Sequence, residues 1–241
     1  MLDTIHVGLS PVKFIAHRGC SGLEKENSAS AFVAACNRSY YGVETDVHRT
    51  ADGQFIIIHD DSTKRVTGDE MIVEETSFDT LRALRLLDTD DVRGRGDLIL
   101  PTLREYASIC HKYGRVSVLE LKNHFEPDDV ERILAVMREA GQLEHTIFIS
   151  FDLPNMICLR EKLPEHPLQY LTYDVTDEVI AALQAHHLDL DVKYVALTEE
   201  NIARLHSLGI LVNTWTVNDP DVARRLASWG VDFITTNILE S

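Results

Sequence analysis

The sequence predicts an α/β fold, a (β/α)8 TIM barrel formed by one domain over residues 1–241. Three observations favour this fold: helical and strand-like patterns alternate strictly from residue 102 onward, eight strand-like runs suit parallel barrel strands, and polar side chains cluster where several runs end. Parallel strands need crossover connections of a dozen or more residues, which the intervening helices supply. The chain has 241 residues, close to the roughly 250 of a typical barrel of this type.

The first part of the chain predicts two barrel strands joined by a helix. After a lead-in of about ten residues, we expect the first strand at residues 13–17 and the second at 42–47. The helix between them should cover residues 28 to about 40, because its apolar residues recur at helical spacing. Asn27 or Ser28 can cap its first turn.

A hairpin is expected directly after the second strand. The dipeptide Asp52-Gly53 is a strong signal for a tight turn. The connection is too short for a parallel crossover, so residues 55–59 should run antiparallel to the second strand, as a flap beside the barrel. If the turn has two residues, Asp46 lies opposite His59.

Residues 61–101 interrupt this pattern and predict a small insertion over the barrel mouth. They contain clustered charges, several glycines and one helical stretch at 78–86. A functional segment and a solvated loop without function both fit this composition.

From residue 102 the chain predicts a regular alternation of helices and strands. Glycines follow several of the helices, as expected for C-caps. The expected helices are 102–113, 127–140, 154–163, 177–185, 199–208 and one that Asp219 caps, and the expected strands are 116–121, 146–151, 168–172, 194–197, 210–217 and 231–235.

Composition and charge limit the class of partner. The sequence is 44% hydrophobic and 26% charged, which is ordinary for a globular domain. Its net charge of −16 repels nucleic acid and anionic membranes, so we expect a small-molecule partner, no nucleic acid and no stable membrane association. No apolar run approaches the roughly 20 residues of a membrane-spanning helix.

The cysteines predict a reducing, cytoplasmic location. The chain has four cysteines, without a C-x-x-C pair or a dense framework. The N-terminal segment has no basic region followed by an apolar one, so we expect no signal peptide. Cys20 follows His17 and Arg18, but no sequence feature marks it as an activated thiol, and we expect it to be structural.

Two carboxylates in the second strand are candidates for a metal site. Glu44 and Asp46 lie two residues apart, so their side chains point to the same face of the strand. A divalent cation such as Mg²⁺ or Ca²⁺ would relieve the repulsion between them. Taken alone, such a pair would more often face solvent, but the nearby His17, Arg18 and His59 favour the metal site.

A third carboxylate and a lysine lie in the strand at 116–121 and just after it. Glu120 and Lys122 alternate with apolar residues and therefore share a face, which in a barrel is the interior. Buried charges must be paired or bound to a metal. We therefore expect Glu120 to be a third oxygen ligand, and Lys122 to pair with it or to hold a substrate anion.

Trp215 is a candidate for contact with the substrate. In the strand at 210–217 it shares a face with Asn213 and Val217, while Thr214 and Thr216 point to the other face. On the inner face its ring would either form a wall of the substrate pocket or fill the core.

Two histidines, three carboxylates, an arginine and a lysine around one barrel mouth suit hydrolysis of a phosphate ester. A metal and Arg18 would neutralise charge on the phosphate. One of His17 and His59 would accept a proton from the attacking oxygen, and the other would give one to the leaving alkoxide. The sequence contains no P-loop, no glycine-rich nucleotide fingerprint and no G-x-S-x-G motif.

These motifs resemble those of the glycerophosphodiester phosphodiesterase family. The resemblance extends from about residue 14 to 237, and many short motifs occur in order with matching spacing. The motifs are His17-Arg18-Gly19, Glu26-Asn27, Ala31-Phe32, Gly42, Glu44-x-Asp46-Val47, Thr50-x-Asp52-Gly53, His59-Asp60, Pro101-Thr102-Leu103, Glu120-x-Lys122 and Trp215-x-Val217-Asn218.

The resemblance implies a metal-dependent barrel hydrolase that cuts glycerophosphodiesters into glycerol 3-phosphate and an alcohol. By resemblance, the cofactor is one divalent cation, Mg²⁺ or Ca²⁺, with Mn²⁺ as a further candidate. The implied roles are an acid–base pair for His17 and His59, phosphate binding for Arg18 and Lys122, and metal binding for Glu44, Asp46 and Glu120.

The sequence departs from the family pattern in two places. Where the family often has Pro-Glu-Asn-Thr, the chain has residues 25–28, Lys-Glu-Asn-Ser, which keep the hydroxyl group. Near the end, the family often has Thr-Asp where this chain has Thr236-Asn237. The second change removes a charge and leaves the role of position 237 open.

Other classes of protein fit less well. A non-catalytic binding protein on a decayed barrel should have lost one of its charged site residues, and all are present. A lipid-cleaving enzyme of the phospholipase C or D type would need an exposed apolar rim or an export signal. A metal-dependent sugar isomerase would not need Arg18 beside His17. The sequence does not determine the preferred alcohol, the identity of the metal or the oligomeric state. It also leaves open whether water attacks the phosphorus directly or a cyclic phosphate forms first.

Overall fold

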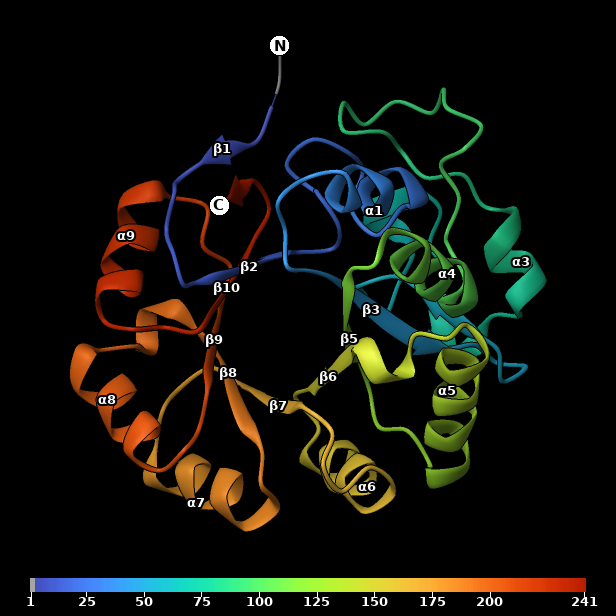
Figure 1. Cartoon of the computed structure of the whole chain (residues 1–241). Helices are drawn as coiled ribbons and strands as arrows, with labels where there is room; N and C mark the ends of the chain where they lie inside the picture. The colour runs from blue at the N-terminus through green and yellow to red at the C-terminus, as the bar shows by residue number, and fades with distance from the viewer. Residues whose placement is uncertain (1–2) are drawn as a thin grey trace.

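The computed structural model describes residues 3–241, which form a closed barrel of eight parallel strands with helices around it (Figure 1). Each strand pairs with the next one along the chain, and β2 closes the ring by pairing with both β10 and β3. The predicted (β/α)8 fold is therefore confirmed. The barrel strands are β2 (Lys13–Ala16), β3 (Gly42–Arg49), β5 (Val116–Leu121), β6 (Thr146–Ser150), β7 (Leu168–Thr172), β8 (Asp189–Lys193), β9 (Val212–Trp215) and β10 (Phe233–Thr236).

Helices cover the outside of the barrel and bury one apolar face each against it. Ser28 caps the first helix by accepting a hydrogen bond from the backbone N–H of Ala31, and Thr102 forms a capping box with Glu105. The first helix ends at Cys36, four residues earlier than expected. The helices are α1 (Ala29–Cys36), α4 (Leu103–Tyr113), α5 (Pro127–Glu139), α6 (Leu153–Lys162), α7 (Asp177–His186), α8 (Glu199–Ser207) and α9 (Pro220–Ser228), with a 3-10 turn at η2 (Leu143–His145).

The sixth barrel strand lies earlier than expected. We expected it at residues 194–197, but β8 covers Asp189–Lys193, and Tyr194–Ala196 form the 3-10 helix η3. The expectation was wrong because the two aspartates of β8 conceal its alternation, and Asp is depleted in strands. Leu190 and Val192 supply the apolar outer face of the strand and are fully buried.

The hairpin after β3 is present as an antiparallel flap. Its second strand, β4 (Phe55–Ile57), pairs with the end of β3. The expected register is wrong by one residue, because the Ile58 N–H donates to the carbonyl oxygen of Asp46 at 3.1 Å. Asp46 therefore lies opposite Ile58 and not opposite His59.

The turn of the hairpin explains this shift. The Thr50 N–H donates to the carbonyl oxygen of Gln54 at 2.8 Å, so three residues form the turn in place of two. Gly53 has φ of +75°, the left-handed conformation that such three-residue loops require. The Asp52 carboxylate accepts from the Thr50 hydroxyl at 2.6 Å and from the Phe78 N–H at 3.0 Å, which ties the turn to the following insertion.

The insertion at 61–101 is a packed element and not a solvated loop. It contains α2 (Lys64–Thr67), η1 (Val73–Glu75) and α3 (Phe78–Ala83), the last of which ends before the expected residue 86. Together with the flap it buries a hydrophobic cluster separate from the barrel core. The cluster consists of Ile56, Ile58, Val66, Val73, Leu81, Leu86, Leu98 and Leu100.

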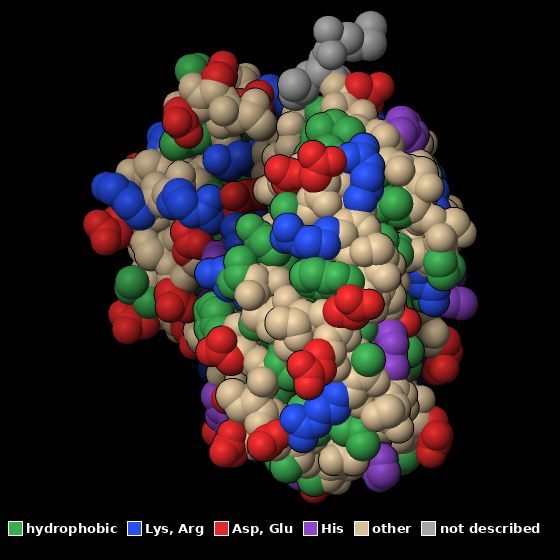
Figure 2. Space-filling model, turned by 90° about the vertical axis from the view of Figure 1, so that its left-hand side faces the viewer, with side chains coloured by type: hydrophobic (Ala, Val, Ile, Leu, Met, Phe, Trp, Pro, Cys, Tyr) green, Lys and Arg blue, Asp and Glu red, His purple; other side chains and the backbone are tan. Residues whose placement is uncertain are grey.

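Segments near both ends of the described chain meet outside the barrel. β1 (Ile5–His6), within the expected lead-in, pairs in parallel with β11 (Leu239–Glu240) (Figure 1). Figure 2 shows acidic and basic side chains interspersed over one face of the molecule. Among residues 3–241, no helix has both the length and the apolar character needed to cross a membrane.

Candidate functional site

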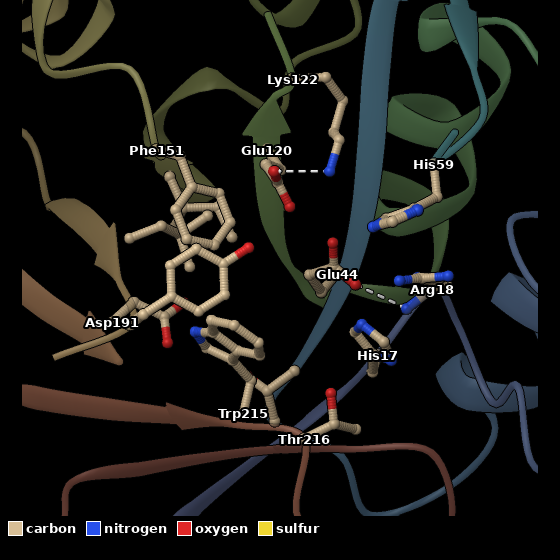
Figure 3. Close-up of a pocket in the computed structure, with 14 residues that line it drawn as sticks. His17, Arg18, Glu44, His59, Glu120, Lys122, Phe151, Asp191, Trp215 and Thr216 are labelled. Carbon is tan, nitrogen blue, oxygen red and sulfur yellow. Dashed lines mark hydrogen bonds and ion pairs between the residues drawn. The ribbon is translucent and has the colours of Figure 1, made fainter. Parts of the chain in front are cut away.

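A cavity of about 260 Å³ opens at the C-terminal ends of the barrel strands (Figure 3). This is the end at which barrel enzymes place their active sites. Of the eight predicted site residues, seven line the cavity: His17, Arg18, Glu44, His59, Glu120, Lys122 and Trp215. The eighth, Asp46, lies beneath them and is 1% exposed.

The three predicted metal ligands lie together. One oxygen atom from each of Glu44, Asp46 and Glu120 is within 4.8 Å of the other two. Pairing of β3 with β5 places Asp46 directly beside Glu120, and the two-residue spacing turns Glu44 and Asp46 to the same interior face, as predicted. Such a buried, all-oxygen set suits a hard divalent cation.

The electrostatics of this triad also favour a cation. Burial, and then the neighbouring Asp46, raise the pKa of Glu44 well above its ordinary value and that of Glu120 to about 8. Burial opposes ionisation of Asp46 as well, but Lys122 and Arg18 outweigh it and lower its pKa. The Oδ1 atom of Asp46 has no hydrogen-bond partner among residues 3–241, so a bound cation would satisfy it.

Two basic side chains border the triad. Lys122 Nζ donates to Glu120 Oε1 at 2.8 Å and lies 3.4 Å from Asp46 Oδ1. The Arg18 guanidinium donates to Glu26 at 2.8 Å, and its backbone N–H donates to Glu44 Oε2 at 2.7 Å. Arg18 Nε is buried and has no hydrogen-bond partner in the described chain. The predicted pairing of Lys122 with Glu120 is therefore present.

The two histidines lie on either side of Arg18 and face Glu44 (Figure 3). His17 follows β2, and its Nδ1 donates to Asn237 Oδ1 at 2.7 Å. An amide oxygen can only accept, so the proton is on Nδ1 and Nε2 is left as the acceptor. Burial, and then the charge of Arg18, lower the pKa of His17 to about 4. Position 237, whose role the sequence left open, thus holds His17 in one tautomer.

His59 has a different partner. Its Nδ1 lies 2.7 Å from Asp60 Oδ1. Burial lowers the pKa of His59, while the charge of Asp46 and the contact with Asp60 act in the opposite direction. A carboxylate beside the ring supports the protonated form, so the two histidines have unlike environments.

Sequence reasoning assigned no role to a set of residues that holds the site in place. Arg65, in the insertion, donates to both oxygens of Glu26 at 2.8 Å and to Asp60 at 2.7 and 3.0 Å. Glu26 also accepts from Arg18, and Asp60 contacts His59. The sequence offered two signals for this set: Asp60 directly follows a site histidine, and Glu26 lies in one of the family motifs.

An aromatic wall closes the cavity opposite the histidines. Trp215 lies 5.7 Å, centroid to centroid, from both Phe151 and Tyr173, which stack on each other at 5.0 Å. Of the two expected placements, the cavity wall and the core, Trp215 therefore has the first. For the two residues after Trp215, the expected faces are wrong. Thr216 lines the cavity and Val217 is buried in the outer core, because β9 ends at Trp215 and the alternation of its side chains ends with it.

Comparisons with known proteins agree with this geometry. The model of the glycerophosphoryl diester phosphodiesterase family matches residues 17–241. The chain is 27% identical over 231 residues to a glycerophosphodiester phosphodiesterase of Bacillus altitudinis, covering 93% of this chain and 94% of that one.

Two solved structures share the fold. A glycerophosphodiester phosphodiesterase from Parabacteroides distasonis ATCC 8503 superimposes with a TM-score of 0.78 at 26% identity, over 98% of this chain and 94% of the other. A phosphodiesterase from Oleispira antarctica, in complex with the product sn-glycerol-3-phosphate, superimposes with a TM-score of 0.82 at 23% identity, over 96% and 95%. With the family match over nearly its whole length, the chain belongs to the glycerophosphoryl diester phosphodiesterase family.

Proposed function

We propose that this chain hydrolyses glycerophosphodiesters to glycerol 3-phosphate and an alcohol, with one divalent cation as cofactor. The observation that carries the proposal is the buried carboxylate triad, which shares one cavity with two histidines of unlike environment. Membership of the family supplies the class of reaction.

Glu44, Asp46 and Glu120 would hold the cation, with Mg²⁺ or Ca²⁺ as the expected ion and Mn²⁺ as a further candidate. When bound, it would supply positive charge that neutralises the phosphodiester and the charge that develops on it. The triad contains three acidic groups within 4.8 Å, more than the two adjacent cations, Lys122 and Arg18, could neutralise.

Arg18 and Lys122 would bind the phosphate oxygens. The buried Arg18 Nε lies 3.7 Å from Asp46 Oδ2 but has no hydrogen-bond partner in the described chain, so it is a donor available to an anion. Glu26 fixes the other end of the guanidinium. Lys122 now donates to Glu120, and it could share its remaining protons with a phosphate oxygen.

We assign the base to His17 and the acid to His59. The Nδ1–H of His17 is bound to Asn237, and its pKa of about 4 leaves Nε2 unprotonated at neutral pH. It can therefore accept the proton of the attacking oxygen. His59 lies against the Asp60 carboxylate, which opposes the effect of burial on its pKa and would stabilise the imidazolium once the ring carries the proton for the leaving alkoxide.

The metal requirement is tested by analysing the products from glycerophosphocholine, glycerophosphoethanolamine and glycerophosphoinositol, with and without a chelator. We expect glycerol 3-phosphate only when metal is present, with Mg²⁺ or Ca²⁺ restoring activity. Glu44→Gln and Asp46→Asn should lose both activity and metal affinity. Asp174→Asn, an exposed carboxylate after β7, is the control. Full activity in excess chelator would refute the metal assignment.

The histidine roles are tested with two esters that differ in their leaving group. Removal of either histidine should cost about 10² to 10⁴ in rate on a natural diester. A nitrophenyl diester needs no acid, so His59→Ala should recover much of its rate on it and His17→Ala should not. Recovery by His17→Ala instead would reverse the assignment, and equal defects on both esters in both variants would rule out a division of acid and base roles.

We further propose that residues 1–241 act as one domain and that the chain works in the cytoplasm on small molecules. Arg65 joins the insertion to Glu26 and Asp60 at the barrel mouth, so the insertion belongs to the same functional unit. The four cysteines are unpaired, which suits a reducing compartment. The strong negative charge disfavours nucleic acid and anionic membranes as partners.

A further inference from the structure

Besides Arg18 Nε, two buried polar atoms of cavity-lining residues have no hydrogen-bond partner among residues 3–241: Asp191 Oδ1 and Trp215 Nε1. The proposed reaction uses neither of them. Asp191 is 2% exposed and lies on β8, across the cavity from Arg18 (Figure 3). An unpaired polar atom in the interior is costly, so both atoms call for a group that the cavity receives.

Asp191 is not part of the metal site. The oxygen atoms that come within 4.8 Å of one another belong to Glu44, Asp46 and Glu120. No arginine or lysine of the described chain pairs with Asp191, and burial, followed by the charge of Glu120, raises its pKa well above the ordinary value. Burial thus favours the neutral form of the carboxyl group, and that form can donate one hydrogen bond as well as accept others.

The two atoms together specify a kind of ligand group. The Trp215 indole N–H can only donate, while the Asp191 carboxyl accepts in either protonation state and in its neutral form also donates. Figure 3 shows the indole nitrogen on the side of the ring where Asp191 lies. A hydroxyl group can accept from the indole and also exchange a hydrogen bond with the carboxyl. A quaternary ammonium can do neither, and a primary ammonium has no lone pair for the indole.

The wall around these atoms suits a short carbon chain. The rings of Phe151, Tyr173 and Trp215 lie within 5.7 Å of one another, and the side chains of Ile149 and Leu171 also line the cavity. Carbon atoms of a small polyol would contact these apolar surfaces while its hydroxyls reach the two polar atoms. The phosphate would remain at the opposite side, beside Arg18.

We propose that Asp191 and Trp215 form a hydroxyl-binding subsite, which selects phosphate esters whose glycerol moiety carries free hydroxyl groups. This inference rests on the proposed function for the phosphate end of the ligand, and it names the residues that recognise the organic end. A site with buried hydrogen-bonding groups discriminates strongly against an analogue that lacks the hydroxyl, because those groups are then left unpaired.

The test compares sn-glycerol 3-phosphate with propyl phosphate, which has the same chain length and lacks both hydroxyls. Their affinities for the metal-loaded protein are measured by calorimetry. We expect the wild-type protein to bind glycerol 3-phosphate at least about 10-fold more tightly. Asp191→Ala should reduce this ratio to near one, and Asp191→Asn should retain much of it, because an amide can still donate and accept.

Two further variants complete the design. Trp215→Phe keeps an aromatic ring and removes the donor, so it should lower the ratio even if Asp191→Ala fails to fold. Asp189→Asn is the matched control, because Asp189 lies on the same strand and accepts from the Leu211 N–H at 2.8 Å, outside the cavity. It should leave the ratio unchanged.

Equal affinity of the wild-type protein for the two phosphates would overturn the inference. A second pair of results would also overturn it. If the affinity ratio in Asp191→Asn is as low as in Asp191→Ala, and the wild-type protein binds 2-aminoethyl phosphate more tightly than propyl phosphate, the subsite binds a cation and not a hydroxyl group. Binding does not require turnover. A chain that failed to hydrolyse glycerophosphodiesters would refute the proposed function while this measurement still gave its own answer.

Discussion

The contact between His17 and Asn237 offers a direct test of how the site sets the protonation of its base. Asn237→Asp would place a carboxylate 2.7 Å from Nδ1 of the ring. The pKa of His17 is about 4, lowered first by burial and then by Arg18. A hydrogen bond to a charged group contributes about 1.5–3 kcal/mol, and one pKa unit corresponds to about 1.4 kcal/mol. The substitution should therefore raise the pKa by about 1–2 units, to about 5–6.

The sign of the effect on activity follows from the role of His17. A base works only when unprotonated, so a higher pKa moves the acidic limb of the kcat/KM profile to higher pH by the same 1–2 units. The assay is this profile with saturating metal, together with the NMR titration of the His17 ring in the metal-free protein. Asn201→Asp, which adds the same charge on α8, is the control and should move neither.

The pH dependence of protein stability gives a second test of the same substitution. The folded-state pKa of His17 lies below the ordinary value of 6.5, so this residue destabilises the protein increasingly as pH falls from about 6.5 to 4. Asn237→Asp raises the folded-state pKa and should lessen that acid destabilisation. An unchanged ring titration and an unchanged acidic limb would refute the reasoning that position 237 sets the pKa of His17.

Three further predictions concern the metal ligands and the acid. Asp60→Asn should lower kcat/KM about 10- to 100-fold on a natural diester and much less on a nitrophenyl ester, because it weakens the support of His59, while an amide oxygen can still accept from Arg65. Equal losses on both esters would contradict this. The pKa of Glu120 is about 8 in the metal-free site, so metal binding at pH 7 should release protons. Calorimetry in two buffers of different ionisation enthalpy detects this release, and identical heats in the two buffers would exclude it. Glu44→Gln should raise the melting temperature of the metal-free protein, more at pH 9 than at pH 6. The raised pKa of the buried Glu44 destabilises the folded state increasingly as pH rises, and the substitution removes that effect. A lower melting temperature of the variant at both pH values would count against repulsion between the buried carboxylates.

The sequence predicted the barrel because most of its strands are apolar runs flanked by clear helices. It misplaced the sixth strand, since its strand signal is divided between two aspartates and two apolar residues. One of those aspartates, Asp191, lines the cavity. A polar side chain that points into the barrel interior can line the site, and the same side chain interrupts the apolar pattern by which a strand is predicted. The feature that places Asp191 in the cavity therefore also concealed its strand.

The site itself was predictable where its residues follow strands in short motifs. Glu44, Asp46 and Glu120 meet because adjacent parallel strands bring equal heights of the barrel together. Contacts between distant segments could not be derived in this way. Arg65 reaches Glu26 across 39 positions, and nothing local to either residue indicates the other.

Closure of the barrel also has a consequence for synthesis. His17 and its acceptor Asn237 are separated by 220 positions, and they meet only when β10 pairs with β2. A nascent chain on the ribosome carries both histidines and all three acidic ligands long before residue 237 emerges, because translation adds only about 5–20 residues per second. Until then the ring of His17 has no acceptor to select its tautomer. We therefore expect a stalled chain that ends before β10 to lack activity, and activity to appear in one step as the last strand inserts.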